Sequence, residues 1–238
     1  MVQASVYWFG LGAVALVVAG IATVIAGALR GRLRSPLYNV PALFSTIAGL
    51  GYGVMALVEL GLVPAFIDDP QVLLAVPQYV SWLLTAALIT YYLGMLANAD
   101  MESRLAGVGA SVLMVVAGFV AVLTGSPVKW GAFVLSVAFF VGVLYIFLRT
   151  YNQSMVENST GSRGLFETLR DLTVSLWLLY PVVFVLGPFG IGVLASVDYH
   201  FLNVFLDIAS RGGFVGVILM RQYELRTFLP EDVSASPN

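Results

Sequence analysis

The chain has 238 residues, of which 60% are apolar and 10% are charged, and its mean hydropathy is +0.95. A soluble domain carries roughly 25% charged residues, so this composition excludes a soluble enzyme. A membrane-spanning helix takes about 20 apolar residues, and the length therefore accommodates about seven spans with short connections and no separate catalytic domain. The formal net charge of -2 and the pI near 5.3 offer no basic field for nucleic acid.

Two residue counts exclude further kinds of site. The chain has no cysteine and a single histidine, His200, which excludes disulfides, thiolate catalysis and a multi-histidine metal site. All of its 11 basic residues except Lys129 are arginine. Any chemistry that needs a lysine amine therefore has one candidate in the whole sequence.

Seven apolar runs, each long enough for a membrane span, predict seven helices. In chain order they cover residues 5–29, 38–62, 77–97, 105–124, 130–149, 165–186 and 201–220. The breaks between them contain Gly, Pro, Asn and Asp, which favour turns, and none is long enough to fold alone. We expect an all-α membrane protein, a bundle of seven transmembrane helices formed by residues 1–226, followed by a short disordered cytoplasmic tail at residues 227–238.

The distribution of basic residues predicts how the bundle is oriented. Nine arginines fall in or beside the connections on one side: Arg30, Arg32, Arg34, Arg104, Arg149, Arg163, Arg170, Arg221 and Arg226. The opposite connections hold Lys129 and the acidic residues Asp68, Asp69 and Asp198. Because basic residues collect on the cytoplasmic side of a membrane, we expect the N-terminus outside and residues 222–238 in the cytoplasm. The protein is then a multi-pass protein of the cell membrane, with the lipid bilayer as its first partner.

Two charged residues interrupt the last apolar run. Asp207 and Arg211 are four residues apart, which places them on one face of a helix where they can pair. A charge at mid-membrane costs roughly 2.5 to 3.5 kcal/mol on insertion scales, so both are candidates for function. Two interpretations stay open, a neutralised structural pair and the lining of an internal cavity. Glu59 lies near the outer end of its run, where contact with water suffices.

Aromatic residues recur at helical spacing in two of the runs. Tyr79 and Trp82 are three residues apart in the third run, and so are Trp177 and Tyr180 in the sixth. Residues at this spacing share a face of a helix. Such stripes more often pack a core than bind a ligand, so the spacing alone does not favour a binding site.

Three long motifs fall in order in the third, sixth and last runs. They are P-Q-Y-V-S-W-L-L-T-A-A-L (77–88), L-R-D-L-T-V-S-L-W-L-L-Y-P-V-V-F-V-L-G-P (169–188) and F-L-D-I-A-S-R-G-G-F (205–214). They resemble R-Y-x-D-W-L-L-T-T-P-L, L-R-N-x-T-V-x-L-W-x-x-Y-P-x-x-W-L-x-G and L-D-x-x-x-K-V-G-F of the microbial rhodopsins, in the branch of archaeal sensory rhodopsin II and bacteriorhodopsin. Residues 91–100 resemble the sensory members more than the pumps. The resemblance covers all seven runs and implies a bundle around a retinal pocket.

The resemblance also implies which residues form that pocket. The candidates for cofactor binding are Tyr79, Trp82, Thr85, Trp177, Tyr180, Phe184 and Arg211. Phe184 stands where the family has a further tryptophan. The candidates for an internal charge site are Tyr52, Gln78, Ser81, Asp207 and Arg211. Asp207 matches the aspartate of the last helix, and Tyr52 matches the tyrosine that hydrogen-bonds it. We therefore expect Asp207 to contact Arg211, with Tyr52 and Tyr180 hydrogen-bonded to its carboxylate.

The reactive centre of the family is changed at four positions. Arg211 replaces the lysine that forms the Schiff base with retinal, and a guanidinium does not condense with an aldehyde as an amine does. Ser81 replaces the carboxylate that accepts a proton, Gln78 replaces an arginine, and Tyr92 replaces the aspartate that donates a proton in pumps. Lys129 lies at an outer turn and cannot substitute. We expect no covalent cofactor, while noncovalent retinal or another apolar ligand stays open.

The resemblance therefore implies a non-pumping sensory or regulatory opsin homologue with a vestigial or noncovalent ligand pocket. The alternative is a light-driven ion transporter or photoreceptor in which arginine is an engineered substitution for lysine. The simultaneous changes at Gln78, Ser81 and Tyr92 favour natural divergence. Two kinds of partner stay open, another membrane protein and a second copy of the chain. Phe205 replaces a tyrosine of sensory rhodopsin II, which removes one hydroxyl from a partner-binding face.

Overall fold

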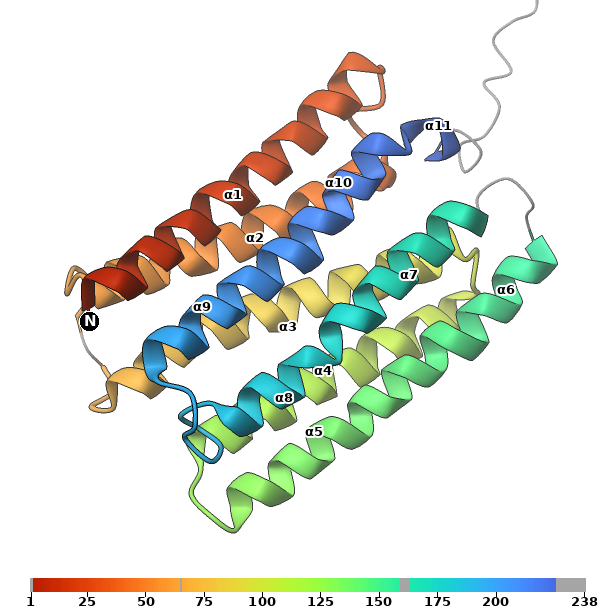
Figure 1. The fold of residues 1–238 in the computed structure, drawn as a ribbon. Helices are drawn as coiled ribbons and strands as arrows, with labels where there is room; N and C mark the ends of the chain where they lie inside the picture. Colours follow the sequence, from red (N-terminus) through yellow and green to blue (C-terminus); the bar gives the residue numbers. More distant parts are fainter. Residues whose placement is uncertain (1, 65, 159–162, 226–238) are drawn as a thin grey trace, which may run out of the picture.

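The computed structural model describes residues 2–64, 66–158 and 163–225. Figure 1 shows the described helices as long rods that run side by side. In chain order the elements are α1 (Val2–Leu29), α2 (Pro36–Glu59), α3 (Pro70–Leu96), α4 (Met101–Leu123), α5 (Val128–Tyr145), the π-helical turn η1 (Ile146–Thr150), α6 (Tyr151–Asn158), α7 (Arg163–Trp177), α8 (Leu179–Leu186), α9 (Ser196–Asp207), the π-helical turn η2 (Ile208–Gly212), α10 (Gly213–Met220) and α11 (Gln222–Leu225).

These elements form seven rods, because η1 joins α5 to α6, α7 continues into α8, and η2 joins α9 to α10. Within the described part of the chain, seven helical stretches are long and apolar enough to cross a membrane. Each of α1 to α4 packs on the next, and the last rod packs on α1, α2 and α7, which closes the bundle. The expected all-α seven-helix bundle is confirmed.

The third rod begins seven residues earlier than the sequence analysis predicts. Asp69 is the N-cap of α3, and its carboxylate accepts hydrogen bonds from the backbone N–H groups of Gln71 and Val72 at 2.8 and 3.4 Å. Pro70 follows at the first helical position, where proline is favoured. Asp69 and Pro70 lie in a break that the sequence predicts as a turn, and in the structure they form the start of a helix. Pro77 lies inside α3, and membrane helices tolerate such a proline because neighbouring groups satisfy the freed carbonyl.

A second acidic cap begins α4. The Asp100 carboxylate accepts hydrogen bonds from the backbone N–H of Ser103 at 2.7 Å and from its hydroxyl at 3.0 Å. Both bonds favour the charged form, so they hold the pKa of Asp100 below its ordinary value. The cap is therefore complete at neutral pH and weakens only as the pH falls through that lowered pKa.

The last three rods are longer or less regular than expected. The fifth continues beyond Arg149 to Asn158. The sixth breaks after Trp177, because Pro181 lacks the N–H that would bond to the carbonyl of Trp177. The last begins at Ser196 and contains η2. The last apolar run begins only at residue 201, because polar residues near Tyr199 precede it, so the sequence predicts a later start than the structure has.

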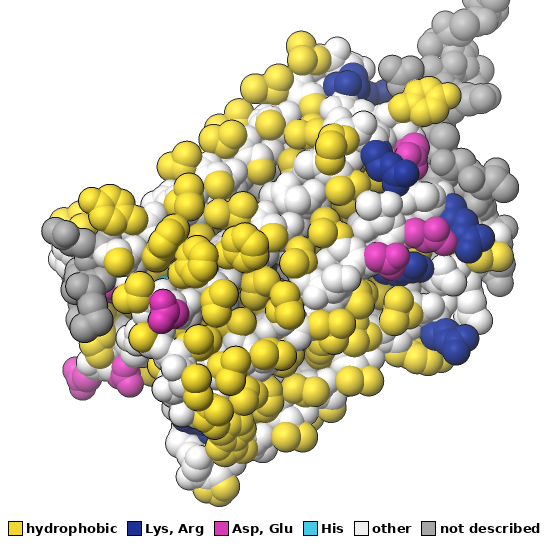
Figure 2. All heavy atoms as spheres, viewed as in Figure 1, with side chains coloured by type: hydrophobic (Ala, Val, Ile, Leu, Met, Phe, Trp, Pro, Cys, Tyr) yellow, Lys and Arg dark blue, Asp and Glu magenta, His cyan; other side chains and the backbone are white. Residues whose placement is uncertain are grey.

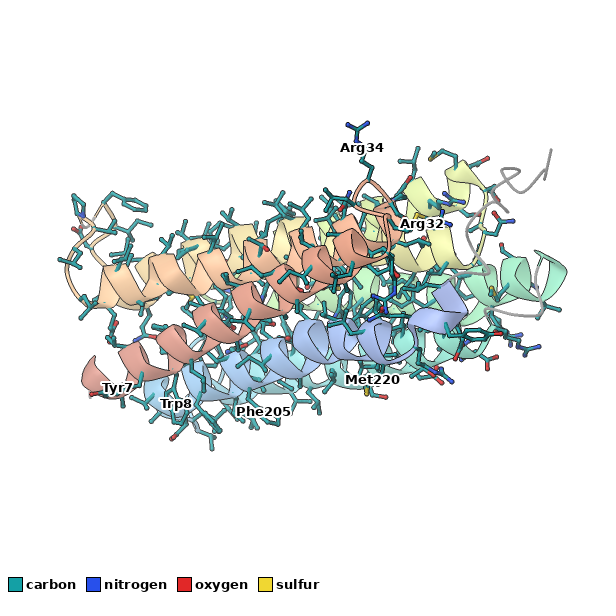
Figure 3. All side chains as sticks on the ribbon, turned by 90° about the horizontal axis from the view of Figure 1, so that it is seen from above. Tyr7, Trp8, Arg32, Arg34, Phe205 and Met220 are labelled. Carbon is teal, nitrogen blue, oxygen red and sulfur yellow. The ribbon has the colours of Figure 1, made fainter. Side chains whose placement is uncertain are left out.

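Charged side chains gather at the two ends of the bundle. Figure 2 shows a middle region covered by apolar side chains, with basic side chains clustered at the end opposite the N-terminus. Figure 3 places Arg32 and Arg34 at the end far from Tyr7 and Trp8. This arrangement agrees with the orientation expected from the positive-inside rule. The domain limit at residue 226 and the tail at residues 227–238 lie outside the described residues.

The orientation has a direct test. We expect added protease to cleave the chain within residues 222–238 in inside-out vesicles and to leave it intact in right-side-out vesicles, since basic connections stay in the cytoplasm. The measurement is immunoblotting of an epitope at the C-terminus. Right-side-out vesicles opened with detergent are the control for cleavability. Cleavage in sealed right-side-out vesicles, with no cleavage in inside-out vesicles, contradicts the predicted orientation.

Candidate functional site

The carboxylate of Asp207 is the centre of a buried polar cluster. Its Oδ2 accepts hydrogen bonds from the Tyr52 hydroxyl at 2.7 Å and from Trp82 Nε1 at 2.9 Å. Its Oδ1 accepts hydrogen bonds from the Tyr180 hydroxyl and from Arg211 Nη1. Asp207 is 1% exposed and Arg211 is 3% exposed. The expected contact of these two residues is present, and four donors from α2, α3, α8 and the last rod surround one carboxylate.

The guanidinium of Arg211 is anchored on both sides. Besides its ion pair with Asp207, Arg211 donates from Nε and Nη2 to the hydroxyl oxygen of Thr85 at 3.2 and 2.8 Å. The turn η2 lies between Asp207 and the residues of α10. Residues four apart lie on one face of a helix, and both charges are buried, so this face looks into the bundle.

A cavity of about 110 Å³ lies beside the guanidinium. Side chains of α3, α4, α5, α7, α8 and the last rod form its wall, and most of them are apolar or aromatic. Of the candidates for cofactor binding, the cavity is lined by Tyr79, Trp82, Trp177, Tyr180, Phe184 and Arg211. Thr85 is the exception, because it contacts Arg211 and does not line the cavity. The aromatic residues that recur at helical spacing in the sequence thus line this cavity, in addition to packing against the core.

Two aromatic rings in the cavity wall are stacked on each other. Phe133 of α5 and Phe184 of α8 lie with their centroids 4.8 Å apart and their planes at 8°. Pockets for ligands of drug size hold roughly 300–1,000 Å³, and an engineered cavity of about 150 Å³ binds benzene. The space present therefore fits a ring-sized group, and a longer polyene requires side chains of the wall to move.

The other candidates for the charge site lie on the opposite side of Asp207. Tyr52, Gln78 and Ser81 border a narrow gap there that has no room for a water molecule. Gly51 lets α2 approach α3 closely, since a Cβ at this position would meet the Cβ of Ser81 at 2.8 Å. The Nε2 of Gln78 is buried with no hydrogen-bond partner among the described residues. Tyr52 thus bonds to Asp207, whereas Gln78 and Ser81 have no hydrogen bond with it.

The sequence of this chain is similar to those of known membrane proteins. The sequence matches the family described as bacteriorhodopsin-like protein over residues 3–224. The chain belongs to the bacteriorhodopsin-like family. It is therefore a multi-pass membrane protein with seven spans. The sensory rhodopsins and pumps of this bacteriorhodopsin-like family are not enzymes, and the family normally binds retinal.

The curated relatives of this bacteriorhodopsin-like chain include sensory rhodopsins from archaea. It is 35% identical to sensory rhodopsin III of Haloarcula marismortui, with 94% of each chain covered. It is 31% identical to sensory rhodopsin-2 of Natronomonas pharaonis, over 92% of this chain and 89% of the relative. A cyanorhodopsin from the cyanobacterium Tolypothrix has the same fold, with a TM-score of 0.85 at 21% identity over 96% of this chain and 99% of that one. The chain is thus related to the sensory rhodopsins.

The residues present do not fit covalently bound retinal. Attachment needs an amine, and the position four residues after Asp207 holds a guanidinium that is already engaged with Asp207 and Thr85. Lys129 lies in the first turn of α5 and is not among the residues that line the cavity. The cavity of this bacteriorhodopsin-like chain therefore has a largely aromatic wall, and no lysine is among the described residues that line it.

Several contacts of the site were not predicted from the sequence. The Trp82 hydrogen bond to Asp207 and the double role of Thr85 as acceptor depend on rotamers, which spacing does not reveal. The wall contributed by α4 and α5, which includes Ser136 and Phe133, carries no motif. Asn203 also lines the cavity. Its position could have been predicted from the sequence, because it lies one helical turn before Asp207 on the same face.

Proposed function

We propose that this chain is a non-pumping sensory or regulatory member of its family, which forms no covalent bond to retinal and binds an apolar ligand noncovalently in the aromatic cavity. The observation that carries the proposal is the ion pair of Arg211 with Asp207. Arg211 stands at the position of the family's reactive lysine, and its guanidinium is engaged in this pair. The cavity beside it, with Trp82 and Trp177 in its wall, supplies the ligand site. Retinal and carotenoid-like molecules are the ligand class suggested by the family.

Ion transport by this chain has less support. A pump must release and accept a proton or ion at the centre of the bundle, and here the carboxylate of Asp207 is held by four hydrogen bonds, one of them from its counter-charge Arg211. Ser81 and Gln78 carry no charge, and Tyr92 donates its hydroxyl to the backbone carbonyl of Leu37 at 3.0 Å. These residues offer no chain of exchangeable charges across the bundle.

A regulatory role requires a partner in the membrane, and the sensory relatives suggest that class of partner. Phe205 lies on the outside of the bundle, 56% exposed (Figure 3). Its ring offers apolar contact area and no hydrogen bond. We propose that any partner contacts this face through side-chain packing, as small and apolar residues do between membrane helices, and a second copy of the chain is the simplest such partner.

Incubation with retinal tests the proposal. We expect no retinyl adduct on the last rod after borohydride reduction, because in the described part of the chain no lysine lines the cavity, and we expect quenching of tryptophan fluorescence, because Trp82 and Trp177 line the cavity. The measurements are intact mass with peptide mapping and fluorescence titration on the protein in lipid nanodiscs, corrected with empty nanodiscs. A retinyl adduct on the last rod contradicts the noncovalent mode. Absence of quenching by retinal and by shorter apolar analogues contradicts a ligand pocket.

A further inference from the structure

The carboxylate of Asp207 needs no hydrogen-bond donor from a ligand, because four donors of the protein already bond to it. Two donors bond to each of its oxygens, Tyr52 and Trp82 to Oδ2, Tyr180 and Arg211 to Oδ1. One of the four donors is the guanidinium of Arg211, which forms an ion pair with the carboxylate. Together with the cation of Arg211 the site has a net charge of zero. A molecule that enters the cavity therefore meets no unbalanced charge.

The guanidinium of Arg211 still has donor capacity. It carries five N–H groups, and its hydrogen bonds to Thr85 and Asp207 use three of them. The neighbouring Tyr180 hydroxyl can accept one more. At least one N–H remains in a side chain that is 3% exposed and lines the cavity. A buried donor without an acceptor is costly, so this end of the cavity favours a ligand that offers an oxygen acceptor.

The favoured acceptor is neutral. Arg211 is the only Asp, Glu, Lys or Arg side chain among the described residues that line the cavity, and Asp207 already cancels its charge. A ligand carboxylate would add an unpaired negative charge close to Asp207 in a medium of low dielectric constant, which is unfavourable. A carbonyl or hydroxyl oxygen accepts the same hydrogen bond and adds no charge.

We propose that the cavity binds a neutral apolar molecule whose terminal carbonyl or hydroxyl oxygen accepts a hydrogen bond from Arg211, and that it selects against the corresponding carboxylate. This inference rests on the proposed function and specifies the chemical class of its ligand. Asp207 acts here as a positioning residue, because it orients the guanidinium and sets the net charge that the ligand meets.

Three probes with one apolar chain test the preference: retinal, retinol and retinoate, which differ only in the terminal group. Their affinities are measured by quenching of tryptophan fluorescence in nanodiscs at mildly alkaline pH, with partition into empty nanodiscs subtracted. For the unaltered chain we expect retinal and retinol to bind with similar affinity and retinoate about tenfold more weakly or worse, since the carboxylate pays for an unpaired buried charge.

The variant Asp207→Asn should reverse this order. It leaves the guanidinium as an uncompensated cation, so retinoate should bind about tenfold more tightly than retinal. The matched control is Glu167→Gln, the same carboxylate-to-amide change in an exposed ion pair with Arg163 at 2.8 Å, outside the cavity. The control should keep the order of the unaltered chain. Equal affinity of the three probes, or an order that Asp207→Asn does not change, overturns the inference and leaves the proposed function standing.

Two further measurements keep the test decisive. If Asp207→Asn does not fold, the unaltered chain is titrated with retinoic acid as the pH falls, and binding should strengthen as the ligand becomes neutral; binding that does not depend on pH overturns the inference. The variant Phe184→Ala removes one ring of the stacked pair in the cavity wall and gives the probes more room. Absence of binding of all three probes to both this variant and the unaltered chain overturns the inference and the proposed ligand pocket together.

Discussion

Replacing Asp207 with asparagine is expected to destabilise the protein by about 3 to 5 kcal/mol, which is the cost of leaving one member of a buried ion pair without its partner. The guanidinium of Arg211 would stay buried among aromatic side chains with no counter-charge. The double variant Asp207→Asn with Arg211→Gln removes both charges, so its loss should be smaller by at least about 1 kcal/mol. The measurement is the free energy of unfolding in detergent for the unaltered chain and the two variants.

The chain offers a matched control for this comparison. Arg163 and Glu167 form a second ion pair at the same four-residue spacing, with side chains 51% and 36% exposed. Exposed pairs contribute about 0 to 1 kcal/mol, so Glu167→Gln should change the stability little. A single Asp207 variant that is as stable as the double variant would show that the two charges are not coupled, and the electrostatic description of the cavity would then be wrong.

Replacing Arg211 with lysine is expected to create a covalent retinal protein. The amine would stand four residues after Asp207 beside the aromatic cavity, at the position of the reactive lysine in the family. We expect a mass gain of one retinyl group after incubation with retinal and reduction, compared with none for the unaltered chain. The absorption of the unreduced adduct should depend on pH, because Ser81 provides no second carboxylate and Asp207 alone would face the adduct.

Lys129 serves as the internal control of this experiment, since it is present in every variant. Peptide mapping must place the adduct on residue 211, and an adduct at Lys129 would be a surface reaction. The variant Arg211→Gln should form no adduct. If Arg211→Lys folds and stays unmodified, the pocket has lost more than its amine, and the stacked rings of Phe133 and Phe184 are the first candidates for the obstruction.

The sequence predicted the bundle because its signals are strong at the level of whole helices. Seven apolar runs and the distribution of arginines depend on composition, which the membrane imposes directly. Helix ends were less reliable. Asp69 caps α3 and Pro70 begins it, although Asp-Pro pairs also occur in turns, and Pro77 does not start the helix that it interrupts. The capping hydrogen bonds that decide such cases are local and appear only in the structure.

The candidate site was predicted where residues act along one helix or carry a family motif. Asp207 and Arg211 belong to this class, and so do the partners Tyr52 and Tyr180. Contacts that depend on the rotation of one helix against another were missed, because the sequence does not give that rotation. The hydrogen bond from Trp82 to Asp207 and the place of Phe133 in the cavity wall are both of this kind.

The ion pair of Arg211 with Asp207 also bears on how the protein is made. A binding partner that is present only in the folded state stabilises that state in proportion to its supply. Here the cation that neutralises the buried carboxylate is part of the chain, so it is supplied with every molecule that the ribosome completes. The chain should then fold in cells that make no carotenoids, and expression in such a host should need no added chromophore.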